Sequence, residues 1–503
     1  MIKGIPDVEF ANLRLGRRNG APLHQQISER IKGAISAGSL APGARLPSSR
    51  SLASQLSVSR ATVELAYSIL SGEGYLNRQN AAGTRVASCP AGPLPQPSER
   101  LPQPLMPGLA SEAGQLPRLF QLGLPALDAF PRKLWSRLAG RHARSLSFSN
   151  MVYQATGGFG PLRQAIANHL AIGRGIPCRS EQIFITAGFL GALALIARTL
   201  LNKGDEVWVE DPNFSPARHT LELAGAHLIP VPVDEEGLNV QAGVALASAA
   251  RLALVTPATQ FPLGVALSPQ RRSQLMSWAA DAGAWVIEDD YGSEFNRADR
   301  AAPAVASAFN CLDHVNRVLH VGSFSHVLFP GLRLGYLVVP ASLADDFERT
   351  SALLPSQPSL LDQMVVADFI FQGHFGRHLA RMRGVYAERK HALVDALRHV
   401  LGDSFQVEES RGMHVLLRLP PNLDDVAIAN QARTHAMAIT AISPMGSRVS
   451  TGPGLLLGFA NITPDTANDA ALRLKSLLTT PLQRESRVQW SGHLEDFWSM
   501  PVG

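Results

Sequence analysis

Seven prolines fall within the twenty residues from 89 to 108. Each proline removes a backbone hydrogen-bond donor and fixes φ, so a segment this rich in proline cannot form a helix or a central strand. Its backbone should be extended and semi-rigid. We therefore expect an interdomain linker over residues 89–117, with an independently folded part on either side.

The two parts differ in charge. Residues 1–88 carry eleven Lys and Arg against five Asp and Glu, a net charge of +6. The whole chain has a net charge of +5, so the other 415 residues sum to −1. A small basic segment attached to a large, nearly neutral body is typical of a nucleic-acid-binding module joined to a domain with a different task.

Composition excludes several other classes of protein. Hydrophobic residues make up 46% of the chain and charged residues 17%, which fits a globular fold and not a disordered chain or a coiled coil. No run reaches the roughly 18 apolar residues of a membrane span, and the first residues lack the apolar core of a signal peptide. Cys89, Cys178 and Cys311 lack the spacing of a zinc or redox site. We expect a cytoplasmic protein with no metal site and no membrane partner.

The basic part predicts three helices and a hairpin. Apolar residues recur every four positions from 23 to 35 and predict a first helix. Ser48 and Ser59 are expected to cap a second and a third helix, which a tight turn separates. Glycines flank residues 75–78 and 84–86, which are expected to pair as a two-stranded wing.

In a helix-turn-helix, the second helix of the motif lies in the major groove, so its exposed first residues must include donors. Arg60 and Thr62 meet that requirement, and arginines around them can hold backbone phosphates. The alternative is that these arginines only solvate a small helical bundle. The candidate DNA-binding residues are Arg45, Ser48, Arg50, Ser59, Arg60, Thr62, Arg78 and Thr84.

This segment resembles the winged helix of GntR-type bacterial transcription regulators. The resemblance rests on GARLPSSRSLA at 43–53, VSRATV at 58–63, GYL at 74–76 and GT at 83–84. It implies a winged helix-turn-helix domain over residues 18–88, mostly α with a small β wing, whose partner is double-stranded operator DNA.

The body predicts an α/β fold. Short apolar runs alternate with longer helical stretches and are expected to form a largely parallel sheet covered by helices. From about residue 350 the pattern is more helical, with a long helix expected over residues 379–401. Two later runs, 415–419 and 455–459, fit a smaller α+β lobe. The runs expected in the main sheet are 183–185, 207–209, 252–255, 285–287, 318–321 and 334–339.

Asp289 and Tyr291 follow one of these runs at its carboxyl end, where open α/β sheets bind ligands. A buried carboxylate there can keep a ring nitrogen protonated. Around these residues the body resembles fold-type I aminotransferases, which use pyridoxal 5′-phosphate (PLP). The matching runs are EDPNF at 210–214, FPLG at 261–264, EDDYGSEF at 288–295 and GSFSHVLFPGLRLGY at 322–336.

Winged helix, linker and body together resemble the MocR subfamily of GntR-type regulators from about residue 20 to about residue 478. The resemblance implies an aminotransferase-like domain over residues 118–480 that senses a small molecule, forms a head-to-tail homodimer and turns over little or no substrate. It assigns Asp289 to the cofactor's pyridinium nitrogen, Phe214 to stacking on its ring and Arg333 to its phosphate.

His326 departs from the family pattern. The family's Schiff-base lysine follows Ser-x-Ser, where this chain has His326, and no lysine lies between Lys203 and Lys390. An imidazole cannot replace a primary amine in that bond, so we expect no covalent PLP, no catalytic residue and no enzyme activity. Leu455–Leu457 stand where many aminotransferases hold an arginine for the substrate carboxylate. GFLG at 188–191 lacks side-chain donors for phosphate.

Several interpretations of the body stay open. It binds PLP or another anion without a covalent bond, it holds a different effector, or it only dimerises and positions two winged helices. The rival class is a PLP-dependent aminotransferase with an attached DNA-binding domain. The role of residues 481–503 is unassigned. The candidate cofactor- or effector-binding residues are Phe214, Asp289, Tyr291, Ser323, Ser325, His326 and Arg333.

Each of four pocket residues also has a purely structural alternative. His326 can fill the place of the lysine and bond to the backbone. Asp289 can be a cap or a loop carboxylate, Arg333 can pair with a nearby acid, and Phe214 can pack in the core. These alternatives are distinguished by hydrogen bonds, ion pairs and exposure.

Overall fold

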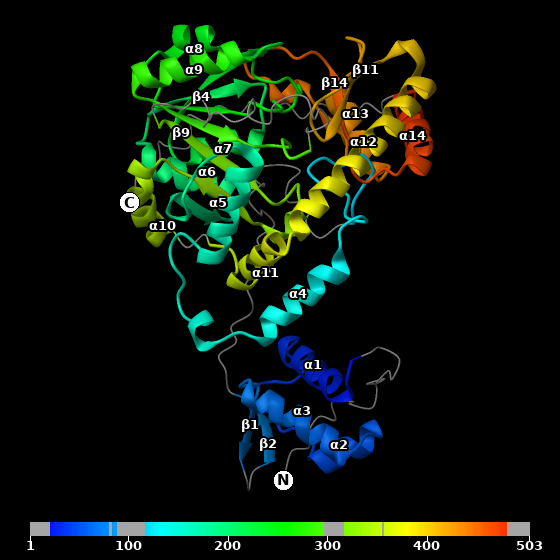
Figure 1. The fold of residues 1–503 in the computed structure, drawn as a ribbon. Coiled ribbons are helices and arrows are strands. Elements are labelled where there is room, and N and C mark those ends of the chain that lie inside the picture. Colours follow the sequence, from blue (N-terminus) through cyan, green and yellow to red (C-terminus); the bar gives the residue numbers. More distant parts are fainter. Residues whose placement is uncertain (1–20, 80–82, 88–115, 296–315, 355–356, 480–503) are drawn as a thin grey trace, which may run out of the picture. The chain divides into compact units, whose positions relative to one another are not determined.

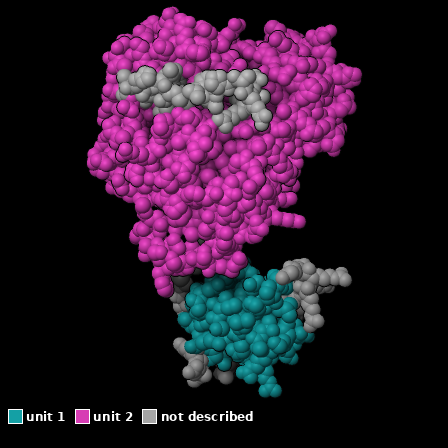
Figure 2. Space-filling view, in the orientation of Figure 1, with its two compact units in different colours: residues 1–114 teal, residues 115–503 magenta. Residues whose placement is uncertain are grey.

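The chain divides into two compact units, residues 1–114 and 115–503 (Figure 2). Of the predicted linker only residues 116–117 are among the described ones, and the tail over 481–503 lies outside them. No helix in the described ranges combines the length and apolar content that a membrane crossing needs. The computed structural model describes residues 21–79, 83–87, 116–295, 316–354 and 357–479.

Unit 1 has the predicted order of elements, with three helices followed by a hairpin among its described residues (Figure 1). Ser48 and Ser59 cap the second and third helices, because each hydroxyl accepts a hydrogen bond from the backbone N–H three residues later at 3.1 Å. Such caps satisfy N–H groups that the first turn of a helix leaves free. The elements are α1 (Leu23–Ser36), α2 (Ser49–Leu56), α3 (Arg60–Gly72), β1 (Leu76–Gln79) and β2 (Gly83–Val86).

One apolar core joins the three helices to the wing. The Tyr67 hydroxyl donates to the carbonyl of Pro47 at 2.9 Å, which fixes α3 against the chain that leads into α2. That leading chain also extends the wing, because the N–H of Leu46 donates to the carbonyl of Thr84 at 2.9 Å. Buried members of the core are Ile27, Ile31, Leu52, Val63, Ala66, Leu70, Leu76 and Val86.

Unit 2 is built on a mostly parallel sheet, as predicted. Eight strands form it in the described part of the chain, in the order β3-β10-β9-β8-β7-β4-β5-β6. The strands from β9 to β5 run parallel, whereas β10 runs antiparallel to both of its neighbours. Their bounds are β3 (Ile183–Thr186), β4 (Glu206–Asp211), β5 (His227–Asp234), β6 (Gly237–Leu238), β7 (Leu252–Val255), β8 (Trp285–Asp289), β9 (Val318–Ser323) and β10 (Gly335–Val338).

Helices cover both faces of this sheet (Figure 1). Successive strand residues point to opposite faces, so Val207 and Val209 pack in one apolar cluster and Trp208 in another. The first cluster includes residues of α6 (Gly188–Leu200), α7 (Ser215–Leu223) and α10 (Ala344–Leu353). The opposite face is covered by α4 (Arg132–Arg144), α5 (Gly160–Arg174), α8 (Val240–Ala247), α9 (Pro269–Ala282) and α11 (Leu360–Phe371).

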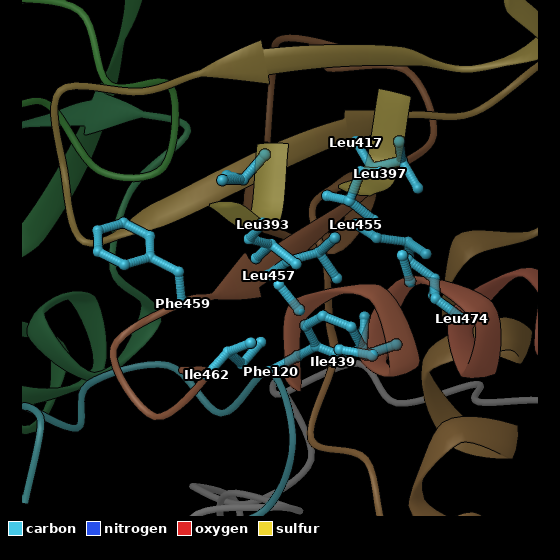
Figure 3. Packing of buried hydrophobic residues seen from close by; sticks show 14 of the residues in the cluster. Phe120, Leu393, Leu397, Leu417, Ile439, Leu455, Leu457, Phe459, Ile462 and Leu474 are labelled. Carbon is cyan, nitrogen blue, oxygen red and sulfur yellow. The ribbon is translucent and has the colours of Figure 1, made fainter. Parts of the chain in front are cut away.

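The predicted smaller lobe is an antiparallel sheet packed on helices. Its strand order is β11-β12-β14-β13. Figure 3 shows Leu393 and Leu397 of the long helix close to Leu455 and Leu457 of β14, with Phe120 in the same core. The elements are α12 (His374–Leu401), β11 (Gln406–Glu409), β12 (His414–Arg418), α13 (Asp425–Thr434), β13 (Thr440–Ala441), β14 (Gly454–Gly458) and α14 (Ala467–Thr479).

One carboxylate joins the main sheet to the smaller lobe. Asp211, the last residue of β4, is buried and accepts three backbone N–H groups of the lobe. They belong to Ser447 and Arg448, at 2.7 Å each, and to Val449, at 3.0 Å. Hydrogen bonds to a charged acceptor are stronger than neutral ones, so this contact fixes the lobe against the carboxyl end of the sheet.

Candidate functional site

The predicted DNA-binding residues lie at the starts of α2 and α3 and in the wing. Arg50 in the first turn of α2 and Arg60 in that of α3 are exposed, and the Arg60 side chain is 70% exposed. Thr62 is half-buried, and its hydroxyl lies 2.8 Å from that of the capping Ser59. The exposed donors therefore come mainly from the arginines, while Ser48 and Ser59 serve the helix ends.

Glu64 joins the parts of this surface. Its carboxylate accepts from Arg78 of the wing at 3.0 Å and lies 3.9 Å from the Nε of Arg60. A hydrogen bond from the Ser49 side chain at the start of α2, together with these arginines, lowers the pKa of Glu64. The sequence assigned no role to Glu64, because its contacts with the wing depend on tertiary structure.

Arg45 and Thr84 complete the surface beside the wing. Thr84 lies opposite Arg78 in the hairpin register, and Arg45 forms an isolated bridge with β2. Gly83 has φ +80°, and a Cβ there would lie 3.1 Å from the Nε of Arg45. The positive φ of the turn favours glycine here, and a larger residue would also make the guanidinium of Arg45 shift slightly.

A second candidate site lies at the carboxyl ends of β8 and β9. The parallel register pairs Asp289 with Val321, so Asp289, Tyr291 and Ser323 emerge at one edge of the sheet. The ring of His326 meets that of Tyr291 edge-on, with centroids 4.9 Å apart. The predicted association of Asp289 and Tyr291 with the histidine segment is therefore present in the fold.

Phe261 extends this group to Phe214. Its ring centroid lies 6.0 Å from Tyr291, 6.1 Å from Phe214 and 5.4 Å from His414. Phe214 is 39% exposed, so it is not a core residue. Phe261 was present in a matching run but had no assigned role, and no local pattern pointed to His414.

Buried polar atoms without partners surround these rings. Nδ1 of His326, Oδ1 of Asn213 and Nδ1 of His414 make no hydrogen bond within the described chain. His414 donates its other nitrogen to the carbonyl of Pro262 at 2.8 Å, so in the neutral ring its Nδ1 is an acceptor. Burial lowers the pKa of both imidazoles to about 4. Unpaired buried polar atoms are costly, and they mark places where a ligand or water supplies the missing bond.

Asp289 is a carboxyl group without a cation among the described residues. Burial raises its pKa well above the ordinary value, and the nearby carboxylates of Asp290, Glu210 and Glu288 raise it further. Burial also raises the pKa of Glu210 to about 7. A ligand with a positive charge next to Asp289 would favour its ionised form.

The neighbouring carboxylate, Asp290, is fully paired. Arg174 of α5 holds it through two hydrogen bonds of 2.9 and 3.0 Å, and both side chains are 4% exposed. Although burial raises the pKa of Asp290, the charge of Arg174 brings it below the ordinary value. Ser293 also bonds to Asp290, and His169 bonds to Glu294 at 2.9 Å. This cluster, which local patterns did not predict, fixes the segment that follows Asp289.

The remaining predicted residues lie on the turn after β9. The Ser323 hydroxyl accepts from the N–H of Ser325 at 3.2 Å. Arg333 has φ +50°, and its backbone N–H donates to the carbonyl of Pro330 at 3.1 Å. Its side chain is exposed and forms no ion pair or hydrogen bond with a described residue. His326 likewise has no side-chain hydrogen bond to the described backbone. The structural alternatives for these two residues therefore have no contact to support them.

The position expected for a carboxylate-binding arginine is apolar. Leu455–Leu457 form the middle of β14 and are buried. Leu456 packs against Leu416 and Ile442, with the partly buried Phe261 at the edge of this cluster. Among the described residues, no group of three or more His, Cys, Asp or Glu could hold a metal ion.

Known families match both units. The gntR family of bacterial regulatory proteins matches residues 23–86, and aminotransferase class I and II matches residues 135–474. The probable rhizopine catabolism regulatory protein MocR of Rhizobium meliloti is 35% identical over 92% of this chain and 95% of its own. The HTH-type pyridoxine biosynthesis transcriptional regulator PdxR of Corynebacterium glutamicum is 30% identical over 88% and 92%, respectively.

Solved structures match unit 2. The α-aminoadipate aminotransferase LysN of Thermus thermophilus has a TM-score of 0.64 and 27% identity, over 71% of this chain and 92% of its own. The kynurenine aminotransferase of Pyrococcus horikoshii has a TM-score of 0.64 and 24% identity, over 72% and 91%, respectively. The latter likeness concerns the fold alone.

Proposed function

The chain belongs to the MocR-type transcription regulators, which join a gntR-family helix-turn-helix to an aminotransferase-like domain, and from this membership we propose that unit 2 controls DNA binding by holding a small molecule without a covalent bond. The observation that carries the proposal is the place of His326. Its ring lies next to Tyr291, with a buried Nδ1 that has no partner among the described residues, and the resemblance of residues 322–336 to the family implies that it stands in place of the lysine. A neutral imidazole there can accept or donate a hydrogen bond, but it cannot replace the primary amine.

PLP is the cofactor that the aminotransferase-like fold implies, and the residues present fit its ring and phosphate but not its covalent bond. The unpaired Asp289 would hold the protonated ring nitrogen, and the exposed Phe214 would cover the ring face. Arg333, without another partner among described residues, would hold the phosphate beside Ser323 and Ser325. When bound, PLP supplies an electron-withdrawing ring. Another anion with a cationic ring would meet the same groups.

We propose that unit 2 is not an aminotransferase. His326 removes the amine, and the leucines of β14 remove the guanidinium for the substrate carboxylate. Burial keeps the imidazole of His326 neutral, since its pKa is lowered to about 4. The second candidate function, an aminotransferase with an attached DNA-binding domain, would need a lysine, and residues 204–389 contain none.

Arg60→Ala should weaken binding to operator DNA. The Arg60 side chain is exposed at the start of α3, so its loss removes one contact to a base edge or a phosphate. A base contact is worth about 1–3 kcal/mol and changes sequence preference, whereas a phosphate contact lowers affinity for all sequences alike. The measurement is a gel shift with duplexes that the wild-type chain selects from a random pool. Unchanged melting would show that the variant is folded. Unchanged affinity and preference would contradict this docking.

We also propose that two chains form a head-to-tail homodimer, in the cytoplasm where operator DNA lies. Phe148, Met151, Val152 and Tyr153 form an exposed apolar segment between α4 and α5, with Phe148 90% exposed. A contiguous exposed apolar segment on a protein of this type marks a protein interface. In a dimer with a two-fold axis the two chains have opposite orientations, and each copy offers this segment to the same segment of the other.

Replacing Phe148 and Tyr153 together by serine should raise the dimer dissociation constant by about 30-fold or more, since aromatic interface residues often contribute over 1 kcal/mol each. Sedimentation equilibrium measures it. The matched control replaces Ile172 and Leu223 together by serine. These two residues are 90% and 77% exposed on separate helices, and their replacement should leave the dimer dissociation constant unchanged. Equal effects of both double variants, or none of either, would contradict the interface.

A further inference from the structure

Positive charge is concentrated in one segment of unit 2. Residues 129–180 contain eight Lys and Arg and no Asp or Glu, although residues 89–503 as a whole sum to −1. Five of these cations lie in the thirteen residues of α4. A helix of a nearly neutral domain does not need this charge for solubility.

The cations of α4 form a stripe. Lys133, Arg137, Arg141 and Arg144 follow one another at steps of four, four and three, which places them on one helix face, and all four are exposed. At 1.5 Å per residue the stripe is about 16 Å long. Because charges repeat every 3.4 Å along each strand of a DNA duplex, a stripe of this length meets several phosphates.

The start of α12 adds to this charge. Arg377 donates to Nδ1 of His374 at 2.7 Å, and the pKa of His374 is lowered first by burial and then by the charges of Arg377 and Arg137. These two arginines of different helices therefore lie near the same ring. Of the stripe residues only Arg141 has a carboxylate partner among described residues, namely Asp368. Lys133, Arg137 and Arg144 are left to bind an anion.

The opposite face of α4 is already buried. Trp135 packs edge-on against Phe329 and Phe369, at 5.3 and 5.9 Å between ring centroids, and Leu138 is 2% exposed. A basic helix that binds a lipid surface needs its apolar face free, so a membrane is disfavoured. Two copies of one cationic stripe would also repel each other across a two-fold axis. A polyanion of another kind is the partner that this surface fits.

We propose that the stripe of Lys133, Arg137, Arg141 and Arg144 binds the phosphate backbone of duplex DNA beyond the part that the winged helix holds. The proposal rests on the proposed role of the chain as an operator-binding regulator. Arginine predominates in the stripe, and its guanidinium matches phosphate in two parallel hydrogen bonds. Such contacts carry no sequence information, and they would add affinity and fix the course of the DNA along unit 2.

The test compares two triple variants of the full chain on a random-sequence duplex of roughly 60 base pairs, on which binding is electrostatic. The first is Lys133→Ala with Arg137→Ala and Arg144→Ala. The second removes the same charge from exposed positions on α6, before β7 and on α13, by Arg198→Ala, Arg251→Ala and Arg433→Ala. Affinity is measured by fluorescence anisotropy over a series of salt concentrations, and melting curves show that both variants are folded.

The stripe variant should bind at least about tenfold more weakly, and its slope of log affinity against log salt should be smaller by about 2–3, since each phosphate contact contributes about 0.9. The control should change the slope by less than about 1. A variant of unit 1 with Arg50→Ala and Arg60→Ala should also lower the slope of log affinity against log salt, and this effect should add to that of the stripe variant.

Equal slopes for wild type and stripe variant would overturn the proposal while leaving operator binding by unit 1 intact. Absence of DNA binding by the wild-type chain would overturn the proposed function as well. Loss of binding to phosphatidylserine vesicles in the stripe variant, with unchanged DNA slopes, would overturn the proposal in favour of a lipid partner.

Discussion

Arg174→Ala should lower the free energy of unfolding of unit 2 by about 3–5 kcal/mol, because it leaves a buried carboxylate without its cation. Arg174 holds Asp290 through two hydrogen bonds, and both side chains are 4% exposed. It also lies 3.5 Å from Glu294. Urea unfolding followed by tryptophan fluorescence measures the loss, and the Trp residues of unit 2 report on it directly.

The control removes both charges together. Arg174→Met with Asp290→Asn should recover most of the stability, since a buried ion pair contributes little against neutral groups of similar size. Glu294 keeps its bond to His169 in that variant. If Arg174→Ala and the double variant lose the same amount, the effect comes from packing and the charge argument is wrong. Loss of PLP-induced stabilisation in the double variant is also expected, because the segment after Asp289 loses its anchor.

His326→Lys should convert a chain that PLP does not modify into one that it labels covalently. The new amine would stand near Tyr291 and the ring group around Phe261, at the position that we propose corresponds to the family's lysine. Burial lowers the pKa of a lysine, and so favours the neutral amine that reacts. After borohydride reduction, mass spectrometry of the peptide that contains residue 326 should show near-complete labelling in the variant and none in the wild type.

His326→Gln is the matched control, since it keeps a polar side chain without an amine. PLP should raise the melting temperature of the wild-type chain without a trapped adduct, by the equivalent of about 2.7 kcal/mol at a concentration one hundred times the dissociation constant. A trapped adduct on a pocket peptide of the wild type, or catalytic amino-group exchange, would refute the non-covalent proposal. An unlabelled His326→Lys variant would refute the placement of residue 326 beside the ring.

The winged helix was predictable because its signals are local. Ser48 and Ser59 cap helices that begin one residue later, and the apolar spacing of α3 gives the buried residues Val63 and Leu70. The pairing of residues 44–46 with the wing was not predictable. It depends on the tertiary fold, which brings β2 back alongside this earlier segment. The same holds for Glu64, which contacts α2 and the wing only in the folded domain.

The main sheet was predicted from runs of buried apolar residues, and β5 was missed for a specific reason. Pro230 and Pro232 interrupt its apolar pattern, and proline usually excludes a central strand. Here β6 pairs only with Val233 and Asp234 of β5. Both prolines precede this pairing, so the backbone N–H groups that they lack are not needed on the β6 side of the strand. The two residues of β13 are too few for any pattern to predict.

The candidate residues of the strand-end site could be selected from the sequence, whereas the contacts that hold them in place could not. Asp289, Tyr291 and His326 belong to runs with a recognisable order, and they come together as expected. Arg174 and Asp290 lie 116 positions apart, and no local sequence pattern around either residue indicates that they form a pair. Long-range charge pairs of this kind depend on the packing of α5 on the sheet, so they become visible only in three dimensions.

The contact of Asp211 with the smaller lobe has a mechanical consequence. Three N–H groups of consecutive residues converge on one buried carboxylate, so moving the lobe away from the sheet would leave that acceptor without these donors. The contact therefore restrains the lobe at the end of β4, directly before Asn213 and Phe214.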